Sequence, residues 1–551
     1  MSLLGVVALV AAADLAIAGA RIRTLDPDLP AAEAVAVRDG RIVYVGDRAG
    51  LGEHTGPATE LIELGGASLY PGFTDAHAHL FGIGLRERTL DLARVASLDA
   101  LLERVAQHAA AAPGPVFGRG WLETHWPEAR FPTRDDLDRV VADRAVLLVR
   151  ADGHAGVANS PALAQAGIGD ATPDPAGGRI ERDSGGRATG MLVDAALDPV
   201  EQDFLATYAQ QRDGIYEAAG QRSVRLGWTG LHNMWNGHDR VEAMERLSES
   251  WRLPLRVYNA AGQGSADAQR LLAEGPRRSA SGRIVTRAIK VYADGALGSR
   301  GAALLAPYAD RPDTSGLLLT QRGDAVALYE HALRAGVQIC THAIGDRANR
   351  LVLDWYAETF ERVPPAERRI AAPRWRIEHA QIVHPDDIAR FAALGIIPSM
   401  QPSHAIGDLH FAPARLGRAR LEGAYAWRSF IESGAIVAAG SDAPVEAGDP
   451  RIEFYAAVAR RDLEGRSGAG WHPEQAVERE AVLKMLTLWP AVAAFQEDEL
   501  GSIAPGKRAD FTAFDRDLLA VPAAQILRAQ PLLTVVDGRV VWRAGAAAGI
   551  Q

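Results

Sequence analysis

The 551-residue chain carries a formal net charge of −10, and 48% of its residues are hydrophobic while 23% are charged. This composition supports a large folded core and excludes global disorder. Net acidity without a long basic run argues against nucleic acid or an anionic membrane as a partner. The single cysteine, Cys340, excludes an internal disulfide.

The first thirteen residues, Met1–Ala13, are apolar and end in small residues. A signal peptide begins with positive charge, which this segment lacks, so we expect a cytoplasmic protein, with export as the alternative. No apolar run in the chain reaches the ~18–20 residues that a membrane-spanning helix needs.

Both ends of the chain predict short β-strands around Asp-Gly turns, at Asp14–Thr24 with Ala34–Gly46 and at Ala509–Asp515 with Leu532–Gly545. We therefore predict that residues 1–70 and 485–551 together form a small β-sandwich. Residues 71–484 would then be a domain inserted between its two halves.

Strands alternating with helical stretches in this middle segment predict an α/β fold, a (β/α)₈ TIM-like barrel. About 150 residues separate the first two strands, too many for one βα unit. We interpret residues 82–215, approximately, as an inserted α/β subdomain that overhangs the barrel's C-terminal face. The eight predicted strands are Phe73–His79, Thr229–Met234, Leu253–Ala260, Thr286–Ala293, Val337–His342, Trp375–Ala380, Ile396–Gln401 and Ile436–Asp442.

Polar side chains follow several of these apolar strands, where the active sites of such barrels lie. His77 and His79 are two residues apart on the first strand, so both imidazoles face the same side. The pair alone is a weak signal, but His342, His379 and Asp442 close three later strands. Together they are the nitrogen and oxygen donors that a divalent metal requires.

Lysine is rare in this chain: Lys290, Lys484 and Lys507 are the three lysines among 59 basic residues. Codon bias accounts for the ratio but not for Lys290, which falls inside a predicted barrel strand. A buried amine is unfavourable unless neutralised or paired. Carbamylation by CO₂ would turn it into a carboxylate that bridges two cations; the alternative is a salt bridge to Asp294 or Asp442.

The order of these residues resembles the amidohydrolase superfamily with a lysine-bridged binuclear metal centre. Nine longer sequence segments are similar to those of the branch of N-substituted formamide deformylases, amidohydrolase family 3. One departure is Val157, where many relatives have Trp, so substrate identity is not carried over. The matching segments are PGFTDAHAHL (71–80), GWLETHWPEARFPTRDDLD (120–138), DGHAGVANSPAL (152–163), GGRIERDSGGRATGML (177–192), IKVYADGALGSRGA (289–302), THAIGDRAN (341–349), RIEHAQ (376–381), GSDAPV (440–445) and GSIAPGKRADF (501–511).

The resemblance implies that His77, His79 and Asp442 bind the more buried of two metal ions. It implies that His342 and His379 bind the other, and that carbamylated Lys290 bridges both. Zinc is the expected metal, with Mn, Fe or Co as alternatives.

The expected reaction is hydrolysis of a carbon–nitrogen bond, other than a peptide bond, in a small-molecule amide, N-acyl or N-formyl substrate. Metal-activated hydroxide would attack the carbonyl, and Asp442 would carry the proton to the leaving amine. An ester, lactone or phosphoester hydrolase on the same site is the alternative. A catalytically silent scaffold is a third hypothesis. It predicts that at least one metal ligand is lost, whereas the sequence has all six expected ligands: His77, His79, Lys290, His342, His379 and Asp442.

Three further residues are candidates for substrate binding: His154, His404 and Gln401. A structural hydrogen-bonding role is the alternative for each. We expect Asp294 to support the ligands and Cys340 to pack in the core. The oligomeric state stays open, with a homodimer as one possibility.

Overall fold

The computed structural model forms two compact units, residues 1–80 with 220–551 and residues 81–219. No helix of the described residues is both long and apolar enough to cross a membrane. The structure describes residues 12–545 except 94, 112, 124, 125, 129, 151–154, 176, 177, 236, 466 and 469.

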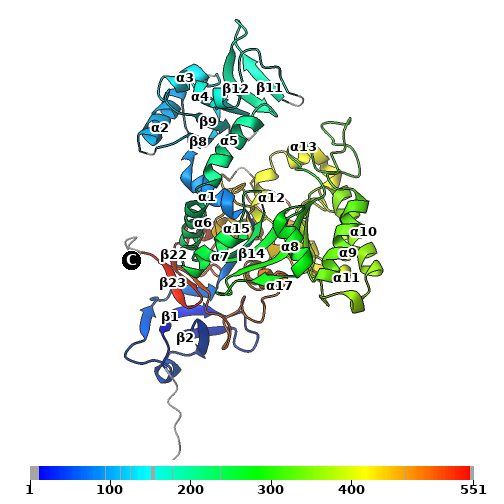
Figure 1. The fold of residues 1–551 in the computed structure, drawn as a ribbon. Coiled ribbons are helices and arrows are strands. Elements are labelled where there is room, and N and C mark those ends of the chain that lie inside the picture. The colour runs from blue at the N-terminus through cyan, green and yellow to red at the C-terminus, as the bar shows by residue number, and fades with distance from the viewer. Residues whose placement is uncertain are drawn as a thin grey trace, which may run out of the picture. The chain divides into compact units, whose positions relative to one another are not determined.

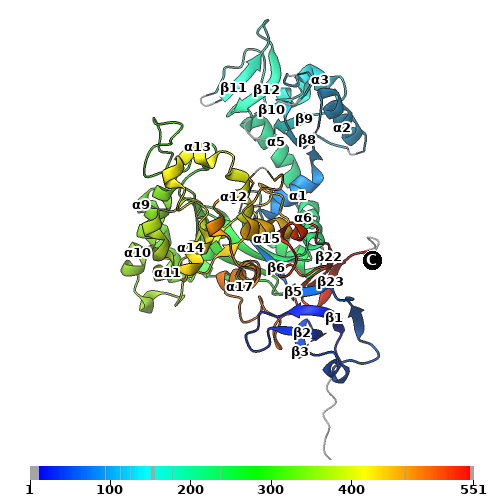
Figure 2. The ribbon, with the colours of Figure 1, turned by 180° about the vertical axis from the view of Figure 1, so that it is seen from behind.

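Strands from both ends of the chain pair in one sheet of the first unit, in the order β23-β22-β21-β5-β1-β2-β3, with β4 beside β1 (Figure 2). The described strands form a single hydrogen-bonded sheet, so the predicted sandwich stays a prediction. The strands are β1 (Leu15–Arg23), β2 (Ala31–Arg38), β3 (Arg41–Gly46), β4 (Glu60–Glu63), β5 (Ser68–Pro71), β21 (Phe511–Phe514), β22 (Pro531–Val536) and β23 (Arg539–Arg543).

The two predicted Asp-Gly turns lie at the β2–β3 and β22–β23 connections. Asp39 and Gly40 have φ of 53° and 72°, and Asp537 and Gly538 have φ of 53° and 77°. Positive φ at both central residues defines the hairpin turn that matches strand twist. The turns also touch: a Cβ on Gly40 would lie 2.8 Å from the carbonyl oxygen of Asp537, which favours glycine there.

Eight parallel strands make a nearly closed barrel in the same unit, in the order β6-β13-β14-β16-β17-β18-β19-β20, as the sequence predicted. Strand β15 (Arg277–Arg278) pairs with β16 outside this order. The strands are β6 (Phe73–Ala78), β13 (Trp228–Met234), β14 (Arg256–Gly262), β16 (Ile284–Tyr292), β17 (Gln338–Ala343), β18 (Arg376–His379), β19 (Ile397–Met400) and β20 (Ala438–Ala439).

Helices follow most barrel strands, and α8 to α11 are neighbours along one side (Figure 1). Two of them end at a left-handed glycine, α9 at Gly336 and α11 at Gly395, with φ of 75° and 66°. The helices are α7 (Val241–Glu249), α8 (Ala266–Glu274), α9 (Arg322–Ala335), α10 (Asp346–Arg362), α11 (Pro385–Leu394), α12 (Pro402–Asp408), α13 (Ala412–Leu416), α14 (Trp427–Glu432), α15 (Pro450–Ala459), α16 (Arg479–Met485), α17 (Leu488–Ala493) and α18 (Ala523–Ile526).

The second unit has a six-stranded sheet, in the order β11-β12-β10-β9-β8-β7, and its own apolar core. Its strands are β7 (Leu90–Asp91), β8 (Val116–Trp121), β9 (Val146–Arg150), β10 (Ala155–Ala158), β11 (Gly178–Arg182) and β12 (Ala188–Asp194). Its helices are α1 (Leu80–Arg88), α2 (Leu98–Ala111), α3 (Arg134–Asp138), α4 (Ser160–Gln165), α5 (Asp198–Ala209) and α6 (Arg212–Leu226), the first and last of which cross into the other unit.

Candidate metal centre

The exits of the first and last barrel strands are joined by backbone hydrogen bonds. The N–H of Asp442 donates to the carbonyl of His77 at 2.7 Å, and the N–H of His79 donates to Ala443 at 2.8 Å. These bonds bring the Asp442 carboxylate to both imidazoles. Its Oδ1 lies 3.0 Å from Nε2 of His79 and 3.5 Å from Nε2 of His77.

His342 and His379 reach the same place from β17 and β18. The His379 ring centroid lies 4.6 Å from that of His77 and 4.6 Å from that of His342. His379 has a φ of 73°, a left-handed conformation that is unusual for a residue with a Cβ and is found at functional sites. His77, His379 and Asp442 each offer a ligand atom, and these atoms lie within 4.8 Å of one another.

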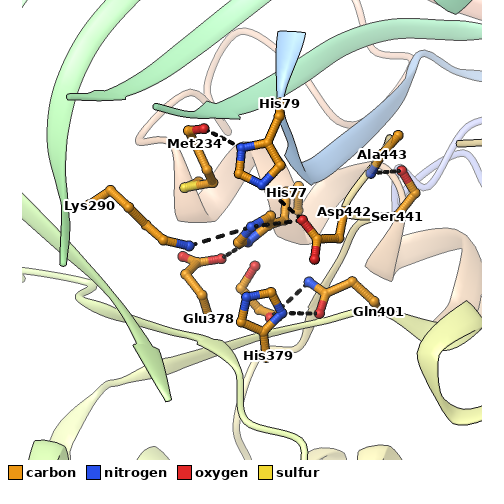
Figure 3. Close-up of polar contacts among 12 residues, drawn as sticks. His77, His79, Met234, Lys290, Glu378, His379, Gln401, Ser441, Asp442 and Ala443 are labelled. Carbon is orange, nitrogen blue, oxygen red and sulfur yellow. Dashed lines mark hydrogen bonds and ion pairs between the residues drawn. The ribbon is translucent and has the colours of Figure 1, made fainter. Parts of the chain in front are cut away.

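Lys290 lies on β16, is 1% exposed, and points its Nζ toward Nε2 of His77 at 3.5 Å (Figure 3). Within the described residues no carboxylate oxygen comes within 4.0 Å of this amine, so the salt bridge to Asp294 or Asp442 is not formed. Burial lowers the pKa of Lys290. An amine with a lowered pKa is more readily neutral, and the neutral amine is the form that reacts with CO₂.

His77, His342 and His379 are held in the neutral state that binds cations. Burial, and next the positive charge of Lys290, lower the pKa of His77 to about 4 and that of His342 to about 3. Burial likewise places the pKa of His379 well below its ordinary value. Burial opposes the charge of Asp442, but the surrounding histidines, His77 first, hold its pKa well below the ordinary value.

Two buried ring nitrogens, Nε2 of His342 and Nε2 of His404, have no hydrogen-bond partner in the part of the chain described here. A buried nitrogen lone pair left without a donor is unfavourable unless something else binds it. With the Asp442 carboxylate 3.7 Å from Nε2 of His404, these atoms fit one or two divalent cations with nitrogen and oxygen ligands.

Of the three predicted substrate-binding residues, the structure describes Gln401 and His404. Gln401 is 2% exposed, and its Oε1 contacts Nδ1 of His379 at 2.7 Å, so it orients a candidate ligand. His404 lies next to a candidate ligand, with its Nε2 3.7 Å from Oδ2 of Asp442. His154 lies outside the described residues. Cys340 is buried on β17, in an apolar cluster with neighbouring barrel strands.

Sequence reasoning missed two charged residues below the ligands, Arg376 and Glu378. Both are fully buried on β18, where Oε2 of Glu378 lies 2.6 Å from Nδ1 of His77. Opposite charges at alternate positions of an otherwise apolar strand are the signal that could have found them, because such charges are buried only when paired.

Asp294 holds the loop above β16, and its Oδ1 also lies 3.6 Å from Nε2 of His342, a candidate ligand. Its carboxylate accepts backbone N–H groups from Ala303 at 2.8 Å and from Ile344 and Gly345 at 2.9 Å. Burial raises its pKa to about 7, against the effect of these donors. One carboxylate thus joins the end of β16 to the loop that follows β17.

Replacing Asp294 with asparagine is expected to lower the free energy of unfolding by about 1–3 kcal/mol, because an amide group would face at least one of these donors. Denaturant unfolding of the metal-free protein would measure this. Asp313→Asn, at an exposed position, should stay within about 0.5 kcal/mol. Equal unfolding midpoints for both variants would contradict the assigned role.

The barrel and its histidine-rich mouth together define a metal-dependent hydrolase. The chain belongs to the amidohydrolase family, whose sequence profile matches residues 60–542. It is 34% identical to YtcJ of Bacillus subtilis, named as an amidohydrolase, over 93% of this chain and 96% of that one. It is 30% identical to the N-substituted formamide deformylase of Arthrobacter pascens, over 95% and 97% of the two chains.

A solved structure has the same fold, that of an uncharacterized metal-dependent hydrolase from Pyrococcus furiosus. It is 28% identical with a TM-score of 0.77, over 92% of this chain and 99% of that one.

Proposed function

We propose that this hydrolase cleaves the carbon–nitrogen bond of a small N-acyl or N-formyl amide. The observation that carries the proposal is the buried Lys290 amine, 3.5 Å from Nε2 of His77, together with the ligand atoms of His77, His379 and Asp442, which lie within 4.8 Å of one another. Similarity to a formamide deformylase over nearly the whole chain supports an amide as the substrate.

In this proposal His77, His79 and Asp442 would hold one divalent cation, and His342 and His379 would hold a second. Lys290, once carbamylated, would offer a carboxylate oxygen to each, and zinc is the metal that this donor set favours. When bound, such cations lower the pKa of water and polarise a carbonyl. Gln401 keeps the imidazole of His379 aligned through its 2.7 Å contact.

We assign the proton transfer to Asp442. Its Oδ1 is held by His79, while Oδ2 faces His404 at 3.7 Å. In the proposed reaction Asp442 accepts the proton of the attacking water and returns it to the amine nitrogen, which must be protonated to leave. His404 is positioned to contact the carbonyl oxygen or the substrate beside it.

Removal of divalent metal is expected to abolish hydrolysis, and zinc should restore it. A panel of formamides, N-acyl amides, lactones and phosphoesters, assayed on the metal-loaded enzyme, would identify the bond. We expect the highest kcat/KM for a formamide or N-acyl amide. Preference for lactones or phosphoesters would contradict the proposed bond, and activity that chelation leaves unchanged would contradict the metal centre.

A further inference from the structure

Beneath the candidate ligands, four barrel strands meet at one guanidinium. Arg376 is fully buried, and its Nη2 donates to the carbonyl of Ala76 on β6 at 2.6 Å and to Oγ of Ser399 on β19 at 2.7 Å. Its Nη1 contacts Nδ1 of His232 on β13 at 2.7 Å. The guanidinium is therefore fixed from several sides, which a flexible surface arginine is not.

The same guanidinium grips Glu378, two residues further along β18. Nε of Arg376 lies 2.7 Å from Oε1 of Glu378, and Nη2 lies 2.9 Å from Oε2. Both side chains are fully buried, so the pair is shielded from solvent and its geometry is maintained by protein contacts alone.

Glu378 also forms a hydrogen bond with His77. Oε2 lies 2.6 Å from Nδ1 of this histidine. An ionised carboxylate has no proton to donate, so in this contact Oε2 accepts a hydrogen bond from Nδ1–H. The proton of neutral His77 is thus placed on Nδ1. Nε2 then carries the lone pair: it can accept a hydrogen bond from the Lys290 amine at 3.5 Å, and Oδ1 of Asp442 lies 3.5 Å from it on the other side (Figure 3).

We propose that Arg376 and Glu378 are positioning residues that fix the tautomer and ring orientation of His77 before a metal binds. The inference rests on the proposed function, because it takes His77 as a ligand. Partners of this kind orient ligands and raise their basicity, and their loss typically lowers metal affinity by about 10–100-fold.

Glu378→Gln is the sharpest test because it keeps the shape and removes the charge. In this variant one of the two carboxylate oxygens becomes an NH₂ group, which must face either Nε of Arg376, now 2.7 Å from Oε1, or Nδ1 of His77, now 2.6 Å from Oε2. Donation to Nδ1 would move the ring proton to Nε2 and block that ligand atom. We expect zinc affinity about 10–100-fold lower, measured by competition with a chromophoric chelator.

The imidazole nitrogen chemical shifts of metal-free protein give a second readout. Wild type should have His77 protonated on Nδ1, and Glu378→Gln should lose that preference. Glu378→Asp keeps the charge and shortens the side chain, so its affinity should lie between the two, and it serves if the glutamine variant does not fold. The control is Glu453→Gln, another fully buried glutamate, whose Oε2 accepts the N–H of Ser403 at 2.9 Å.

The outcomes separate this inference from the proposed function. Wild type that binds no divalent metal would overturn both. Wild type that binds zinc, with Glu378→Gln binding equally well and His77 unchanged in tautomer, would overturn only the positioning role. Equal losses in Glu378→Gln and Glu453→Gln would also overturn it, because they would indicate a general effect of disturbing the core.

Discussion

Lys290→Arg is expected to lower kcat/KM by about 10³-fold or more, since loss of a bridged cation removes several kcal/mol of stabilisation at about 1.4 kcal/mol per tenfold. Arginine keeps the positive charge but cannot form a carbamate. At 1% exposure the larger guanidinium also has little room beside His77. Steady-state kinetics on the preferred amide, with bound zinc counted by atomic spectroscopy, would measure both losses.

Lys484→Arg is the matched control. This lysine lies on α16, partly exposed, with Nζ 3.2 Å from Oε1 of Glu480, an ion pair that arginine can also make. Its kinetics should be nearly unchanged. Isotopically labelled bicarbonate should give a carbamate carbonyl signal in wild type and none in Lys290→Arg. Equal activity in the two variants would refute the bridging role.

The barrel could be predicted from sequence because each strand is a short apolar run ended by polar residues. Buried parallel strands need continuous apolar side chains, so the eight runs stand out. Strand ends were less certain, since hydrogen-bonding partners define them. β20 spans only Ala438–Ala439, and Asp442 lies beyond it on a backbone with φ of 58°.

The candidate ligand set, whose metal binding stays a prediction, was also accessible from sequence, because a metal would require particular residue types at the strand ends. The supporting contacts were not. Gln401 was predicted to bind substrate, which stays a prediction. Its Oε1 contacts His379, and the parallel pairing of β18 with β19 brings these strand ends together. The link between Glu378 and His77 joins residues 301 positions apart, a proximity that depends on barrel closure.

Asp442→Asn is expected to lower kcat for an amide by about 10²–10⁴-fold, the usual contribution of a positioned general acid–base group. The amide side chain keeps an oxygen near His79, where the carboxylate now lies at 3.0 Å. It cannot accept a proton from water and pass it to nitrogen. An amine leaves only when protonated, whereas a phenolate leaves without help.

Leaving-group dependence separates the proton transfer by Asp442 from its role as a ligand. If the carboxylate carries the proton, Asp442→Asn should impair an N-acyl amide far more than an aryl ester of the same acyl group. If the carboxylate only holds metal, kcat should fall by the same factor for both substrates, and the amount of bound zinc should fall in proportion. Asp449→Asn is the control, a carboxylate that caps α15 by accepting the N–H of Arg451 at 3.0 Å. This carboxylate has no part in the proposed proton transfer, so Asp449→Asn should leave kcat nearly unchanged. A fall in kcat as large as that of Asp442→Asn would mean that Asp442 has no special part in the chemistry.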